Sequence, residues 1–279
     1  MTPPLKTPQR LVRTERIEPG TVEALAGLLD VPVPTRALPP MWHQVHLLER
    51  PPQHALGPDG HPTRGIPAPP GPGRKRMFAG GRVTTLRPLA IGEDATRTTW
   101  VSGTVEKQGR TGPLTFVTVR SEVVQGDGLA VVEEGDIVYR EPGSTVAATP
   151  GTLDDAPWPA PDDAPSLALR ADEALLFRYS ALTYNAHRIH YDHQWVRHEG
   201  YADLVVHGPL QALMLAELAR RNDVDLVGRE LSYRLVAPMT GPQTFTVTAG
   251  EEGVERGGEV RDVHGTVTAV SAIGLITNG

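Results

Sequence analysis

Residues 179–218 read YSALTYNAHRIHYDHQWVRHEGYADLVVHGPLQALMLAEL, and this stretch decides both the fold and the chemistry that the chain can carry. It contains five of the ten histidines. Histidine has the ordinary pKa closest to neutrality, so such a cluster indicates acid/base chemistry or metal binding. If the residues from Gly208 to the end of this stretch form a helix, almost no face of that helix is polar. A helix that is apolar on all sides is buried, which predicts a central helix with a sheet wrapped around it.

The sequence around this stretch predicts an α+β second half. The helix over residues 208–221 has Pro209 at its first position, which favours initiation, and two arginines at its end, which complement its dipole. Helices over 172–182 and 193–199 precede it, the second capped by Asp192. Val- and Thr-rich segments predict strands at 167–170, 230–237, 243–251 and 259–273. Helices followed by a series of strands are typical of α+β domains.

The first half has similar parts. We expect a short helix at residues 21–29, with Thr21 as its cap. Strands are expected at 80–88, 96–108, 114–124 and 129–139. TFVTVRSEVV and LAVVEEGDIVYR, joined at Gln125-Gly126-Asp127-Gly128, form a clear hairpin pattern.

Two proline-rich segments organise the chain. Residues 51–72 contain eight prolines and can be neither regular helix nor central strand. Residues 142–165 contain six prolines, four aspartates and no basic residue, which is the composition of a semi-extended linker. We therefore divide the chain into residues 1–141, a linker at 142–165, and residues 166–279.

Several features of the central stretch follow one another in a fixed order. They are a small-residue lead-in, an aliphatic-His-x-Asp string, a Gly-aromatic turn and a His-Gly helix start, at residues 180–183, 189–192, 200–201 and 207–209. This order resembles the hydratase-2 motif of the MaoC-like hot-dog enzymes. Three positions depart from it: Asn185 replaces the catalytic Asp, His187 an Asn and Arg188 a Pro. The variant NAHRIHYD is similar to a subgroup that includes mitochondrial-type 3-hydroxyacyl thioester dehydratases and mesaconyl-CoA hydratases.

The resemblance implies a double hot-dog, with two antiparallel sheets each wrapped around a central helix. Because residues 1–141 have no counterpart of NAHRIH, their hot-dog would be degenerate and would shape the substrate pocket. The implied reaction is reversible hydration of an enoyl-CoA to a 3-hydroxyacyl-CoA. The abundance of arginine fits a mesaconyl-type dicarboxyl substrate, and medium-chain enoyl thioesters are the alternative. No metal or redox cofactor is implied, since CoA is part of the substrate.

Three residues carry the expected catalysis. His190 suits the role of general acid/base because an imidazole can be poised near the operating pH. Asn185 cannot transfer protons as a carboxylate would, but its amide can position the water; alternatively it is a turn residue. The Gly208 N–H stands at a helix start, where unpaired donors and the dipole favour an anion, and it would polarise the thioester carbonyl. One imidazole can complete both proton transfers if the addition is syn.

We also expect a second group of residues to contact the substrate: Tyr184, His187, Arg188, His207, Arg74 and Arg76. Arg188 can pair with a substrate carboxylate or a CoA phosphate, or remain a solvated loop charge. His187 would hold the catalytic loop, and His207 would fix the turn before the buried helix. The basic run around Arg74 and Arg76 can meet the CoA phosphates.

Other readings remain open. His187, His190 and His193 are spaced by three, but a loop-like lead-in and the absence of a HExxH pattern disfavour a metal site. A thioesterase would need a carboxylate to activate water, and the motif offers Asn185. A non-catalytic acyl-thioester binding module would keep the buried helix but has no need of His190.

Composition narrows the remaining classes. The formal charge of −6 argues against nucleic-acid binding. The absence of cysteine removes disulfides, zinc–thiolate sites and a Cys nucleophile. No apolar run approaches the roughly 20 residues of a membrane span. Prolines interrupt the basic N-terminal segment that a mitochondrial presequence would need as a helix. We expect a cytoplasmic monomer or homodimer.

Overall fold

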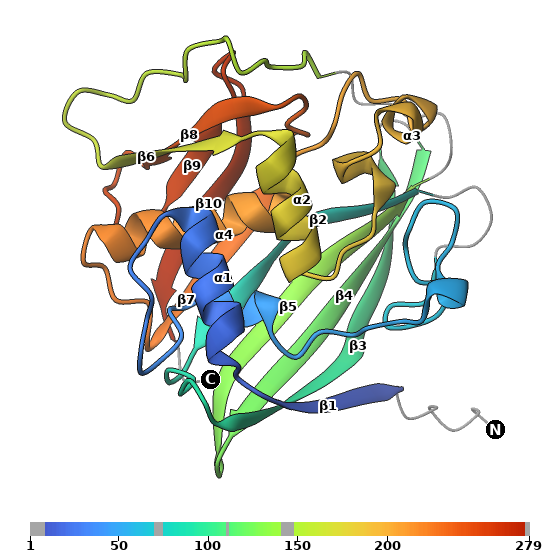
Figure 1. The fold of residues 1–279 in the computed structure, drawn as a ribbon, viewed down its shortest axis with the longest axis vertical. Helices are drawn as coiled ribbons and strands as arrows, with labels where there is room; N and C mark the ends of the chain where they lie inside the picture. The colour runs from blue at the N-terminus through green and yellow to red at the C-terminus, as the bar shows by residue number, and fades with distance from the viewer. Residues whose placement is uncertain (1–8, 70–74, 110–111, 141–147, 277–279) are drawn as a thin grey trace.

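The computed structural model describes residues 9–69, 75–109, 112–140 and 148–276. Ten antiparallel strands form one sheet in the order β1-β3-β4-β5-β2-β7-β10-β9-β8-β6. The first five strands in this order come from residues 9–140, here called the first half. The other five come from residues 166–276, the second half. In Figure 1 the sheet curves around the helices, which lie on its concave face.

The strands are β1 (Arg10–Arg16), β2 (Lys75–Thr85), β3 (Asp94–Gly109), β4 (Gly112–Gln125), β5 (Gly128–Arg140), β6 (Ser166–Ala171), β7 (Arg229–Leu235), β8 (Gln243–Ala249), β9 (Gly258–Arg261) and β10 (Val267–Leu275). The α-helices are α1 (Pro19–Leu29), α2 (Glu173–Leu182), α3 (His193–His198) and α4 (Gly208–Arg221), and the 3₁₀-helices are η1 (Trp42–Val45), η2 (Gln53–Ala55) and η3 (Arg188–His190).

Helix α4 confirms the prediction of a buried central helix. Every residue from Leu210 to Ala219 is buried, and α4 contacts β2 and β7 to β10. Helix α1 follows the edge strand β1 as α2 follows the edge strand β6, so α1 is the counterpart of α2 and lies beside it (Figure 1). In the described first half, the place before β2 that corresponds to α4 carries only η1 and η2. The strand order is symmetric about the β2–β7 pair, which gives the expected double hot-dog.

The two sheets of the expected double hot-dog join edge to edge within the chain. Strands β2 and β7 pair along residues 80–85 and 229–234 and join the two sheets into one. A free strand edge exposes unpaired N–H and C=O groups, and this pairing satisfies them within the chain.

Local sequence explains how the elements begin and end. The side chains of Asp172 and Asp192 accept backbone N–H groups at the starts of α2 and α3, as predicted for Asp192. Thr21 does not cap α1, because the helix already begins at Pro19, whose ring fixes a helical φ.

The segment 259–273 forms two strands and not one. Asp262 accepts the backbone N–H groups of His264 and Thr266 and so forms a turn that separates β9 from β10.

The two halves share one hydrophobic core. It runs without a break from Ile17 to Ile273, and Trp42 Nε1 of the first half donates to Glu217 Oε1 of α4 at 2.9 Å. Residues 148–165 contain turns but no helix or strand. Because the core is continuous, the domain limits at 141 and 166 stay a prediction. Among the helices that the structure describes, none is long and apolar enough to cross a membrane.

Candidate active site

A cavity of about 1280 Å³ lies where the two halves meet. Its walls are the loop between α2 and η3, the start of α4, the ends of β2, β5 and β7, and the proline-rich loop of the first half. Asn185, His190 and Gly208, the three expected catalytic residues, all line it. The fold therefore brings together positions that are more than twenty residues apart in the sequence.

His190 is held as a neutral base. Its Nδ1 lies 2.7 Å from the carbonyl oxygen of Val205, and because a carbonyl only accepts, Nδ1 carries the proton. Nε2 has no hydrogen-bond partner within the described residues, and its lone pair is available to the cavity. The side chain is only 7% exposed. Burial, followed by the nearby His187, lowers the pKa of His190 to about 3.

His207 packs against the ring of His190 and holds it in position. The two rings stack with centroids 3.6 Å apart, and His207 Nε2 is hydrogen-bonded to the Ser180 hydroxyl at 2.8 Å. Burial lowers the pKa of His207 well below its ordinary value. His207 does not line the cavity. His207 lies at the residue before α4, away from the cavity wall, and its role at that turn stays a prediction.

Asn185 combines the two roles that its sequence context left open. Its Oδ1 accepts the backbone N–H of His187 at 3.0 Å, which is a turn that Asn side chains commonly make. Its backbone N–H donates to Ser180 O at 2.8 Å. The amide NH₂ and the second lone pair of Oδ1 have no partner in the described structure, so the side chain can still hold a water in the cavity.

Gly208 places a free donor at the cavity wall. It is the first residue of α4, and its N–H has no partner within the described residues. A Cβ at this position would lie 2.1 Å from Leu235 Cδ1, so a larger residue would force the Leu235 side chain to move. An unpaired N–H at a helix N-terminus suits a thioester oxygen that gains negative charge.

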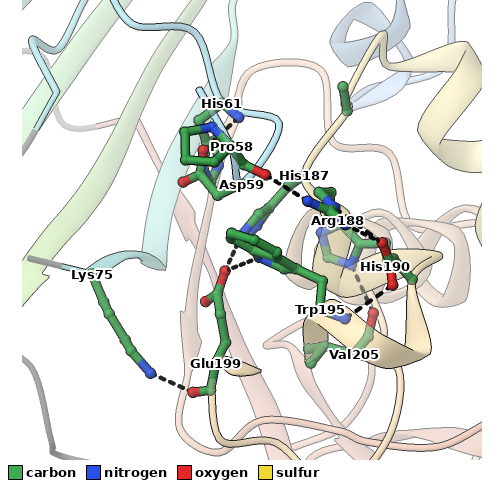
Figure 2. Close-up of polar contacts among 12 residues, drawn as sticks. Pro58, Asp59, His61, Lys75, His187, Arg188, His190, Trp195, Glu199 and Val205 are labelled. Atoms are coloured by element: carbon green, nitrogen blue, oxygen red, sulfur yellow. Dashed lines mark hydrogen bonds and ion pairs between the residues drawn. The ribbon is translucent and has the colours of Figure 1, made fainter. Parts of the chain in front are cut away.

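His187 is fixed by a carboxylate, as Figure 2 shows. Glu199 Oε1 accepts from His187 Nε2 at 3.3 Å and from Trp195 Nε1 at 2.7 Å. Burial raises the pKa of Glu199, but these hydrogen bonds and the charges of His187 and Lys75 outweigh it, and the net pKa is lowered. Glu199 is therefore an anion that holds His187 in the cavity wall, in line with the predicted loop-holding role.

A loop of the first half supports the catalytic loop. Asp59 O accepts the Arg188 N–H at 2.9 Å. His61 Nδ1 donates to Asp59 Oδ2 at 3.0 Å, and the His61 ring lies 3.9 Å from that of His187. Nothing local in the sequence reveals this contact, because its two partners are more than 120 residues apart.

The other expected contact residues divide into three groups. Arg188 is absent from the cavity wall, because its guanidinium pairs with Asp192 at 2.6 Å and donates to Pro58 O at 2.9 Å. We therefore correct its predicted substrate contact to a structural role. Tyr184, which is 52% exposed, and Arg76 both line the cavity. Arg74 lies outside the described residues.

His187, His190 and His193, whose spacing the sequence disfavoured as a metal site, do not gather around one point. His193 Nδ1 pairs with Asp203 at 3.0 Å and is not part of the cavity wall. Another group does: Asp59, His61 and His187 each offer a ligand atom, all within 4.8 Å of one another. In the described structure, hydrogen bonds to Asp59 and Glu199 already use one ring nitrogen of each imidazole.

Comparison with known proteins now decides the family. A family model described as hydroxyacyl-thioester dehydratase type 2 matches residues 41–241. The chain belongs to the hydroxyacyl-thioester dehydratase type 2 family. A relative named mesaconyl-C(4)-CoA hydratase, from Chloroflexus aurantiacus, is 44% identical over 271 residues, which cover 93% of this chain and 94% of that protein.

Solved structures share the fold of this dehydratase. HtdX of Mycobacterium tuberculosis matches with a TM-score of 0.64 and 16% identity over 96% of this chain and 100% of its own. A MaoC-like dehydratase from Phytophthora capsici matches with a TM-score of 0.65 and 15% identity over 98% of this chain and 96% of its own. The predicted MaoC-like resemblance and the fold are thus confirmed, and the chain is a hydro-lyase of the enoyl/3-hydroxyacyl thioester type.

Proposed function

We propose that this enzyme reversibly hydrates a methyl-branched dicarboxylic enoyl-CoA of the mesaconyl-C4-CoA type. The observation that carries the chemistry is the pairing of a neutral His190, with Nε2 free, and an unpartnered Gly208 N–H in one cavity. The substrate class draws support from the 44% identical relative named mesaconyl-C(4)-CoA hydratase.

The proposed hydration moves two protons through one imidazole. His190 Nε2 takes a proton from a water that Asn185 holds, and the water oxygen bonds to the β-carbon. The π electrons shift toward the thioester oxygen, where the Gly208 N–H stabilises the negative charge. The imidazolium then returns its proton to the α-carbon. Both transfers occur on the face that His190 occupies, so we expect syn addition.

Cofactor, location and assembly belong to the same proposal. The steps above need no metal and no redox group, so we propose that none takes part. We also keep the expectations of a cytoplasmic enzyme and of a monomer or homodimer.

The first experiment compares mesaconyl-C4-CoA with crotonyl-CoA, followed at the enoyl-thioester absorbance, for wild type and His190→Ala. Loss of a positioned general acid/base lowers the rate by about 10²–10⁴-fold. His193→Ala is the matched control, because this histidine lies on α3 away from the cavity wall. Release of free CoA without loss of the double bond would instead support a thioesterase, and binding without turnover would support a binding module.

A further inference from the structure

An arginine without a partner stands in the wall of the cavity. Arg140, at the end of β5, is 6% exposed and lines the cavity. Within the described residues, its Nε has no hydrogen-bond partner and its guanidinium forms no ion pair. A buried guanidinium without an anion is unfavourable. The missing anion is therefore expected to come from a bound molecule.

Two further donors surround this guanidinium. Lys75 lies directly opposite Arg140 in the β2–β5 pairing, so both side chains leave the sheet on the same face. Lys75 Nζ donates to the backbone oxygen of Glu199 (Figure 2) and keeps other N–H groups free. Tyr201 is two residues after Glu199 in the sequence, and it also lines the cavity.

The effects of the Arg140 charge on the pKa of Lys75 and of Tyr201 indicate that Arg140 lies near both side chains. After burial, the charge of Arg140 is among the causes that lower the pKa of Lys75. Arg140 also opposes the rise that burial causes in the pKa of Tyr201. The carboxylate of Glu199, whose charge also acts on Lys75 and Tyr201, is already engaged by His187 and Trp195. The cluster of Lys75, Arg140 and Tyr201 thus offers donors to the cavity and no acceptor of matching charge.

We propose that Lys75, Arg140 and Tyr201 bind the free carboxylate of a dicarboxylic enoyl-CoA. This subsite rests on the proposed function and names the group that would set its substrate class. A guanidinium binds a carboxylate through two parallel N–H···O bonds, and the lysine and tyrosine supply further donors. A methyl group in place of the carboxylate would leave the buried guanidinium and two half-buried donors without this partner, so neutral enoyl thioesters would be disfavoured.

The position of the cluster favours the acyl carboxylate over a CoA phosphate. The exposed apolar residues of the cavity wall include Phe177 at 64%, Tyr184 at 52% and Val236 at 46%. They mark an opening to solvent, through which the pantetheine arm and its phosphates would extend. Arg140 is buried, and the acyl group is the part of a CoA thioester that enters an enzyme most deeply.

Pairs of substrates that differ only in the carboxylate test this subsite. They are mesaconyl-C4-CoA with 3-methylcrotonyl-CoA, and fumaryl-CoA with crotonyl-CoA. For Arg140→Met, kcat/KM on the dicarboxylic member should fall by at least ~30-fold, as expected when one partner of a buried charge pair is lost. On the neutral member it should change by less than ~3-fold, the scale of a near-neutral contact. Arg178→Met, which removes an exposed arginine outside the cavity, is the control.

The other outcomes separate failure of the subsite from failure of the proposed function. Equal losses on both members that vanish with pantetheine thioesters, which lack the CoA phosphates, would identify a phosphate site and overturn the subsite alone. A selective loss in Arg76→Met but not in Arg140→Met would also overturn it. A wild type that hydrates only the neutral members would overturn the proposed substrate class itself.

Folding of the variants is checked by their thermal transitions. If Arg140→Met does not fold, Lys75→Met and Tyr201→Phe carry the same comparison. Selective loss on the dicarboxylic members supports the subsite, and equal losses on both members overturn it.

Discussion

The rings of His190 and His207 lie face to face, with centroids 3.6 Å apart and planes 17° apart. Such contact is acceptable only if at least one ring is neutral, because two imidazolium ions at this distance would repel strongly. Burial lowers the pKa of both. The stack therefore fixes the orientation of His190 and keeps it in the basic form that hydration needs.

Ser180 should act through this stack. Ser180→Ala removes the hydroxyl that is hydrogen-bonded to His207 Nε2 at 2.8 Å and leaves a buried nitrogen unpaired. We expect kcat to fall by about 5–30-fold, corresponding to about 1–2 kcal/mol for an unmade buried hydrogen bond, with KM little changed. Steady-state kinetics on the preferred thioester measure both constants.

Thr183→Ala provides the matched control for this experiment. Its hydroxyl bonds backbone carbonyls of Tyr179 and Ser180 and does not contact a histidine. If both variants lost the same activity, general loosening of the α2 end would explain the effect, and the positioning role of Ser180 would be wrong.

Stability should fall on mild acidification. Burial lowers the pKa of His190 to about 3 and of His46 to about 4, and the pKa of His207 is also well below 6.5. Below pH 6.5 the unfolded chain binds protons that these native side chains do not, so the free energy of unfolding decreases. Each histidine contributes a slope of up to about 1.4 kcal/mol per pH unit.

Urea unfolding between pH 7.5 and 5 measures this slope. The depressed carboxyl pKa values, about 2 for Asp59 and Glu133, act only below about pH 4.5 and do not contribute in that window. His46→Leu should reduce the slope of the free energy of unfolding against pH by up to about 1.4 kcal/mol per pH unit, which is the contribution of one histidine. A free energy of unfolding that does not change between pH 6.5 and 5 would contradict neutral burial of these histidines.

The sequence predicted the second half well because its signals are local. Residues 208–221 are apolar on every face, and the observed α4 has the predicted bounds. The NAHRIH string placed His190 and Asn185 in the cavity wall. Strand β1 (Arg10–Arg16) was missed, because exposed and half-buried positions alternate along it and no side chain of it is buried, so its sequence has no core-facing pattern.

Contacts between distant segments could not be predicted in the same way. Periodicity shows that a strand has a buried face, but it does not show which edges meet, so the sequence could not name β2 and β7 as the strands that join the two sheets. Similarly, Arg188 looked free in the sequence, whereas the fold supplies it with Asp192 and with Pro58 of the other half. Pairing across the chain decides whether a charged side chain binds substrate or supports a loop.

Removal of metal ions should leave the reaction unchanged. Asp59, His61 and His187 come close enough to hold an ion, but the proposed steps use His190 and the Gly208 N–H. We expect equal turnover before and after dialysis against a chelator, with metal content measured by elemental analysis. Activity that is lost on chelation and restored by one divalent cation would overturn the metal-free mechanism, and loss of that rescue in His61→Ala would place the ion.

Gly60 should couple the two halves of the enzyme. A Cβ at this position would lie 1.7 Å from the carbonyl oxygen of Ala186, and its φ of +89° is unfavourable for any other residue. Gly60→Ala must therefore push the first-half loop away from the catalytic loop, and the hydrogen bond from Arg188 N to Asp59 O should be lost. We expect kcat to fall by at least ~10-fold, since small displacements of a catalytic group are costly, while the thermal transition shifts by only a few degrees.

Gly20→Ala is the control for this experiment. A Cβ at Gly20 would meet nothing within 4 Å, so this variant should keep full activity. An active Gly60→Ala enzyme would show that the catalytic loop holds its geometry without the first half.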